Sequence, residues 1–253
     1  MKLHYRELGK GQPLLILHGL FGSSDNWQSQ AKKFAEYFRV ICVDLRNHGH
    51  SNWNNDSSYE AMSNDIIELI QDLKLESTIL LGHSMGGKVA MFTTQKRSEL
   101  VDKLIVADMG VKSYPPHHQQ ILEGIHSVKL ENVSSRSEAE KELSKFIDNE
   151  GVKQFLLKNI YWKEKGKLAW RMNVEVLEKS MNQILAEIPE IEVLTPTLFV
   201  RGELSNYILD DDISEIENLF PDSQFVTIEK AGHWVHAEKP DEFVNTVLSF
   251  CLR

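Results

Sequence analysis

The sequence predicts an α/β protein in which helices flank a mostly parallel central sheet and one helical cap is inserted. Short apolar runs recur along the chain, helical patterns separate them, and one long segment lacks a strand pattern. The apolar runs are residues 13–18, 40–45, 78–82, 104–107, 197–201 and 225–228. Because these runs are apolar throughout rather than alternating, they are typical of parallel strands that helices cover on both sides.

The intervals between the apolar runs carry helical spacing of apolar residues. We expect helices over residues 28–38, 59–73, 86–97 and 241–252. Alternation of strands and helices favours a parallel sheet, and such sheets bind ligands at the carboxyl ends of their strands. Residues 2–8 are expected to add an antiparallel strand at one edge.

Residues 112–189 break this alternation, because they contain several helical patterns and no convincing strand. Two prolines, Pro115 and Pro116, open the segment, whose entry point follows the carboxyl end of a predicted strand. We interpret it as a helical cap over the strand ends, inserted into a core formed by residues 1–111 and 190–253. The alternative is a group of helices packed elsewhere on the sheet.

Composition restricts the class of protein. The 253 residues are 42% hydrophobic, which suffices for one buried core, and the net charge of −9 would repel nucleic-acid or lipid phosphates. No segment offers the roughly 18 apolar residues of a membrane span, and the N-terminus lacks the apolar stretch of a signal peptide. Cys42 lies in an apolar run, so we expect no disulfide with Cys251 and a cytoplasmic location.

A candidate nucleophile lies in the sequence Gly82-His83-Ser84-Met85-Gly86, which fits the pattern G-x-S-x-G. The motif follows an apolar strand and precedes a helical pattern, which is the setting of a sharp turn that exposes a serine. The helix that follows would point its N-terminal amides at the serine and favour negative charge there. The alternative is a glycine-rich turn without a catalytic role.

A serine hydroxyl needs a base, and His233 follows the last predicted strand. His236 competes for this role but lies further from the strand, near the next helix. His117 and His118 suggest a metal site only weakly, because adjacent residues rarely converge on one metal and no companions have ligand spacing. We therefore predict no metal.

Four segments together resemble the α/β-hydrolase superfamily and, within it, the YbfF-type small acyl esterases. They are residues 18–27 (HGLFGSSDNW), 44–51 (DLRNHGHS), 82–91 (GHSMGGKVAM) and 231–233 (AGH). The resemblance implies that the backbone amides of Leu20 and Met85 form an oxyanion hole. Phe21 is then a candidate pocket wall, or a core residue. In the cap, Tyr161, Trp162 and Trp170 either line an acyl channel or pack the cap helices together.

The acid of the implied triad departs from the family pattern. Many members carry Gly-x-x-Asp after the strand at residues 197–201, whereas this chain has Ser205 at the aspartate's position, and a serine carries no charge. We favour Asp108, at the end of an earlier strand, over Asp210 and over Glu203. Each choice preserves the chain order serine, acid, histidine.

The predicted activity is acyl transfer to water on a small-molecule ester or thioester, through an acyl-enzyme on Ser84 and without a cofactor. The same triad would also serve a carbon–carbon hydrolase, a lyase of menaquinone synthesis or a peptidase. A non-catalytic binding protein of the same fold is a further alternative.

Overall fold

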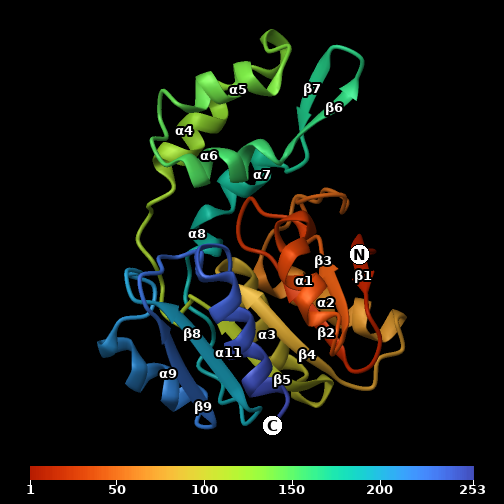
Figure 1. Ribbon diagram of the computed structural model, residues 1–253, viewed down its shortest axis with the longest axis vertical. Coiled ribbons are helices and arrows are strands. Elements are labelled where there is room, and N and C mark those ends of the chain that lie inside the picture. Colours follow the sequence, from red (N-terminus) through yellow and green to blue (C-terminus); the bar gives the residue numbers. More distant parts are fainter.

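The computed structural model describes residues 1–253 and has a seven-stranded sheet at its centre (Figure 1). The strand order is β1-β3-β2-β4-β5-β8-β9. The strands are β1 (Tyr5–Leu8), β2 (Pro13–Leu17), β3 (Arg39–Val43), β4 (Thr78–His83), β5 (Val101–Ala107), β8 (Thr197–Gly202) and β9 (Ser223–Ile228). All neighbours are parallel except β1 and β3, so the predicted sheet and its antiparallel edge strand are confirmed.

Helices cover both faces of the sheet. The core helices are α1 (Gln28–Phe34), α2 (Tyr59–Asp72), α3 (Met85–Lys96), α9 (Ile213–Leu219), α10 (Val235–Glu238) and α11 (Pro240–Cys251). Short 3₁₀ segments are η1 (Ser24–Trp27), η2 (Ser98–Leu100), η3 (Leu130–Asn132) and η4 (Asp210–Asp212). Along β4, Ile79 and Leu81 belong to the same apolar cluster as α1 and α11, whereas Leu80 belongs to the cluster that contains α2 and α3. This alternation explains why the strands are apolar throughout.

The inserted segment forms a separate lobe at the top of Figure 1. Its helices are α4 (Gln119–Ser127), α5 (Arg136–Leu143), α6 (Glu150–Leu157), α7 (Val174–Lys179) and α8 (Met181–Ile184). The expectation that it contains no strand was wrong, because β6 (Ile160–Glu164) and β7 (Lys167–Trp170) form an antiparallel hairpin. These strands are only five and four residues long, and their apolar stretches, residues 160–162 and 168–170, are shorter than the apolar runs of the central sheet.

The cap is joined to the core by apolar packing and by buried polar groups. Leu122, Ile125 and Leu156 of the cap belong to the same apolar cluster as α2 and α3. Lys88 of α3 donates from Nζ to the carbonyl oxygens of Lys112 (2.7 Å) and Ala186, near the two ends of the cap segment. The cap therefore lies against the helix that follows Ser84.

Neither cysteine is cross-linked: Cys42 and Cys251 are both buried and free. Burial raises the pKa of each thiol to about 12, so both are protonated at neutral pH. None of the helices is both long and apolar enough to cross a membrane.

Candidate active site

Ser84 occupies the sharp turn between β4 and α3, with a φ of 54° that non-glycine residues rarely adopt. The residues two positions before and after Ser84 must be glycines. A Cβ on Gly82 would lie 2.2 Å from the Gly86 carbonyl oxygen, and a Cβ on Gly86 would lie 2.4 Å from that of Leu17. The turn therefore forms only with glycine at positions 82 and 86.

The side chains of Ser84, His233 and Asp108 form one continuous chain of hydrogen bonds. His233 Nε2 lies 2.9 Å from Ser84 Oγ, and His233 Nδ1 lies 2.8 Å from Asp108 Oδ2. Because a carboxylate only accepts, Nδ1 donates to it and Nε2 is free to accept the serine proton. Ser84, Asp108 and His233 follow β4, β5 and β9, so the carboxyl ends of three strands bring them together. The arrangement can move a proton from the hydroxyl to the imidazole.

Asp108 is fully buried and has a φ of 51°. Its backbone N–H donates to the carbonyl oxygen of Val200 (2.7 Å) on the adjacent strand β8. Its Oδ1 accepts from the N–H of Gly202 (3.0 Å), and its Oδ2 accepts from the hydroxyl of Ser205 as well as from His233. Three donors thus satisfy a carboxylate that would otherwise be costly to bury.

The other candidate acids have partners away from His233. Asp210 is 84% exposed and pairs with Arg201 (2.6 Å). Glu203 accepts from the backbone N–H of Lys230 (2.8 Å). Of the acids considered, only Asp108 contacts the imidazole.

Tyr207 was not anticipated from the sequence, yet its ring stacks on the His233 imidazole, with centroids 3.9 Å apart and an interplanar angle of 15°. Its hydroxyl lies 2.5 Å from His117 Nε2, and its carbonyl oxygen accepts from the Tyr114 hydroxyl (2.8 Å). The stack holds the imidazole from one face. A tyrosine in a loop after a strand carries no sequence signal for such a contact.

The proposed oxyanion donors lie on two elements beside Ser84. Leu20 follows β2, and its N–H has no acceptor in the protein. Met85 is the first residue of α3, where helix amides have no partner within the helix. A Cβ on Gly19 would lie 3.2 Å from Ser84 Cβ, so the loop after β2 passes close to the serine.

A cavity of about 530 Å³ opens at Ser84 and His233, between the strand ends and the cap. Leu20, Phe21, Ile121, Val152 and Phe155 supply apolar walls. Its volume is within the range of small-molecule sites. Residues of α6, in the inserted segment, thus line the same cavity as residues at the carboxyl ends of the strands.

Two of the predicted pocket residues lie elsewhere. Tyr161 and Trp162 belong to the β6–β7 hairpin, which extends away from the sheet (Figure 1). Neither residue lines the cavity. The Tyr161 ring lies under the guanidinium of Arg171 at 4.3 Å, and Trp162 is 53% exposed. Phe155 and Ile121 provide the apolar cap contacts that these aromatic residues were expected to make.

Several histidines around the site are buried and uncharged. Burial lowers the pKa of His83 well below its ordinary value and that of His236 to about 3. His83 Nε2 donates to the carbonyl oxygen of His233 (2.9 Å), and the His236 ring stacks on Trp27. His236 thus packs beside the site and makes no contact with Ser84 Oγ, and no group of three or more side chains could hold a metal ion.

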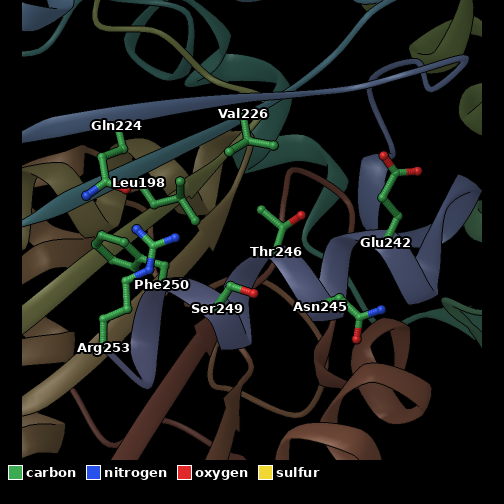
Figure 2. Close-up of a pocket in the computed structure, with 9 residues that line it drawn as sticks. All are labelled: Leu198, Gln224, Val226, Glu242, Asn245, Thr246, Ser249, Phe250 and Arg253. Atoms are coloured by element: carbon green, nitrogen blue, oxygen red, sulfur yellow. The ribbon is translucent and has the colours of Figure 1, made fainter.

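A second hollow of about 510 Å³ lies between α11 and the edge strand β9, and Figure 2 shows its lining. The side chains labelled there include Gln224, Asn245, Thr246 and Arg253, and no histidine or cysteine. It therefore lacks a nucleophile with a base, in contrast to the cavity at Ser84.

Comparison with known proteins gives consistent matches along the chain. A family model described as alpha/beta hydrolase fold matches residues 12–240. The mouse sn-1-specific diacylglycerol lipase ABHD11 is 39% identical over 246 residues, spanning 94% of this chain and 80% of the lipase. Esterase YbfF of Escherichia coli is 34% identical over 238 residues, spanning 93% and 91%. A solved structure described as a marine microorganism esterase superposes with a TM-score of 0.96 at 43% identity, covering 98% of this chain and 99% of that one.

Proposed function

Because the chain belongs to the α/β-hydrolase fold family, we propose that it is a serine esterase that cleaves acyl esters through an acyl-enzyme on Ser84. The observation that carries the proposal is the hydrogen-bonded chain from Ser84 through His233 to the buried Asp108. The esterase and lipase names of its relatives support an ester as the scissile group.

Acylation begins when Ser84 Oγ attacks the ester carbonyl carbon and His233 Nε2 takes the hydroxyl proton. The carbonyl electron pair moves onto oxygen, which accepts from the amides of Leu20 and Met85. Each such preorganised donor is worth about 3 kcal/mol of transition-state stabilisation. Collapse of this intermediate breaks the bond to the leaving group, which takes the proton from His233 and departs as the alcohol.

Deacylation repeats these steps with water. His233 takes a proton from water as the oxygen attacks the acyl carbon, and the bond to Ser84 Oγ breaks. The proton returns to Ser84, and the carboxylic acid leaves. Asp108 holds the imidazole in the tautomer that these steps need and stabilises its charged form. Apart from the substrate and water, only Ser84 and His233 exchange protons in these steps.

The substrate is a small acyl ester or thioester whose acyl group fits the apolar part of the cavity. Leu20, Phe21 and Phe155 would contact a hydrocarbon chain, whereas His118 and Lys158, which line the same cavity, have polar side chains. A cavity of about 530 Å³ with mixed lining suits a substrate with one apolar and one polar end.

The proposal is tested by an acyl-chain series of p-nitrophenyl esters and matched acyl-CoA thioesters on the purified protein. We expect turnover of at least one series, and a fall of about 10⁴-fold or more in kcat for Ser84→Ala, because a missing nucleophile disables the whole triad. Undiminished hydrolysis by Ser84→Ala would contradict the proposal. Absence of turnover on every ester would favour a binding protein.

A further inference from the structure

The loop that carries the Leu20 amide is a tight turn closed by a hydrogen bond from Gly22 N–H to the Gly19 carbonyl oxygen (2.9 Å). Its third residue, Phe21, has a φ of 59°, a conformation in which glycine or asparagine is usual and a bulky side chain is strained. A strained residue keeps such a conformation only where its surroundings fix it. The contacts of Phe21 therefore determine whether the Leu20 amide stays in place.

Two buried side chains hold the backbone of Phe21 from opposite sides. Its N–H donates to His48 Nε2 (3.1 Å), and its carbonyl oxygen accepts from Asn159 Nδ2 (2.7 Å). His48 Nδ1 donates to the carbonyl oxygen of Arg46 (2.9 Å), which leaves Nε2 as an acceptor. Burial lowers the pKa of His48 to about 3, so the ring remains neutral and keeps this acceptor at physiological pH.

The two side chains that hydrogen-bond the Phe21 backbone come from different parts of the molecule. His48 belongs to the loop after β3, whereas Asn159 lies in the cap between α6 and β6 (Figure 1). Within the cap, the Asn159 N–H donates to the Leu156 carbonyl oxygen (2.9 Å), and the Asn159 carbonyl oxygen accepts from Arg171 N–H (2.8 Å). The amide side chain is therefore placed by the folding of the cap and reaches Phe21 only when the cap is docked on the core.

We propose that Asn159 is a positioning residue through which the docked cap sets the oxyanion hole, by holding the Phe21 carbonyl so that the Leu20 amide faces the reacting oxygen. The inference rests on the esterase activity proposed above. Without Asn159 the Phe21 backbone keeps one side-chain hydrogen bond, to His48, and the Leu20 amide loses alignment. Since deleting one oxyanion donor costs about 10²–10³-fold in kcat, a misaligned donor should cost about 10- to 100-fold.

The test compares Asn159→Leu, which keeps the approximate volume and removes the donor, with Asn173→Leu. Asn173 is the matched control, because it also joins the cap to the core, through Asn47 (3.3 Å), without touching the oxyanion turn. We expect Asn159→Leu to lower kcat about 10- to 100-fold with KM within about threefold. Asn173→Leu should keep kcat within about threefold, since the turn remains held.

A second readout isolates the oxyanion from general effects on folding. An aliphatic trifluoromethyl ketone adds to Ser84 Oγ and places a negative oxygen in the hole, so its affinity should fall by the same factor as kcat in Asn159→Leu. If that variant is poorly folded, Asn159→Ala provides the same comparison. Unchanged kcat and ketone affinity in a folded Asn159 variant, or an equal loss in Asn173→Leu, would overturn the role of Asn159. Absence of ester turnover by the unmodified protein would instead overturn the proposed function on which that role rests.

Discussion

Asp108 shows how a single buried charge is made tolerable and useful. It is inaccessible to water and accepts from the Gly202 amide, the Ser205 hydroxyl and His233 Nδ1. In the proposed mechanism, the carboxylate fixes the tautomer of the imidazole by accepting from Nδ1. A carboxylate with this role must stay rigid, which the adjacent strand ensures through the Val200 carbonyl.

Asp108→Asn is expected to lower kcat by about 10³–10⁴-fold, because an amide can hold the imidazole in the wrong tautomer. Asp210→Asn is the matched control: Asp210 is 84% exposed and bonded to Arg201, so its kcat should stay within about twofold. Steady-state kinetics on one p-nitrophenyl ester decides between them. A large loss of kcat in Asp210→Asn, with kcat retained in Asp108→Asn, would assign the acid to Asp210 instead.

Ser205 is one residue whose contribution to the site was not predicted from the sequence. Its position suggested that the acid had been lost from the loop after β8, since a hydroxyl has no charge. In the structure the hydroxyl donates to Asp108 Oδ2, so the loop still contributes a hydrogen bond to the proposed acid. Seeing this requires knowing that β5 and β8 are neighbours in the sheet, which fixes how their following loops converge.

At the scale of elements, apolar runs and glycines were the reliable signals. The strand β4, the turn at Ser84 and the helix α3 lie where their patterns indicated, because the packing of Gly82 and Gly86 permits no other residues. The β6–β7 hairpin was missed, since its strands are short, have apolar stretches of only three residues each and pair with each other within the cap. Of the two roles considered for the cap aromatic residues, lining the acyl channel does not hold for Tyr161 and Trp162, which lie on this hairpin.

Phe155→Ala in α6 is expected to raise KM for longer acyl esters several-fold, because it removes an apolar wall of the cavity. Trp162→Ala, in the hairpin, should leave KM unchanged along the whole acyl series, since Trp162 is 53% exposed and lies outside the cavity. The measurement is KM against chain length for both variants. A larger effect from Trp162 would mean that the hairpin folds over the site during turnover.

At the scale of the whole molecule, the architecture was predictable because it depends on many apolar residues at once. The alternation of strands and helices led to the parallel sheet, and the antiparallel strand β1 was expected at its edge. The site depends instead on few contacts between distant residues, such as Tyr207 on His233 and Asn159 on Phe21. The spacing of apolar residues along the sequence does not indicate which distant residues come into contact.

The buried histidines also make overall stability depend on pH. Burial lowers the pKa of His48 and of His236 to about 3, whereas in the unfolded chain each returns to about 6.5. The unfolded chain therefore binds more protons below pH ~6.5, and the free energy of unfolding falls as pH drops from there toward the folded pKa. Above pH ~6.5 these groups are neutral in both states and have no effect.

His236→Phe removes one such group and keeps the ring that stacks on Trp27 at 4.2 Å. The Nδ1 atom of His236 has no hydrogen-bond partner, so the substitution removes no bond there. Urea unfolding at pH 7.5 and pH 5.0 should show a loss of stability in both proteins, smaller by about 2 kcal/mol in the variant. An equal loss of unfolding free energy in the two proteins would show that His236 does not contribute to the pH dependence of stability.

The central claim is that Ser84 is the activated nucleophile of the site. The most direct measurement is labelling of the native protein with a fluorophosphonate, followed by mass spectrometry of its peptides. We expect one adduct, on Ser84, formed rapidly in the native protein and far more slowly in His233→Ala, because the imidazole activates the hydroxyl. No adduct, or an adduct on another serine while Ser84 stays unmodified, would contradict the claim.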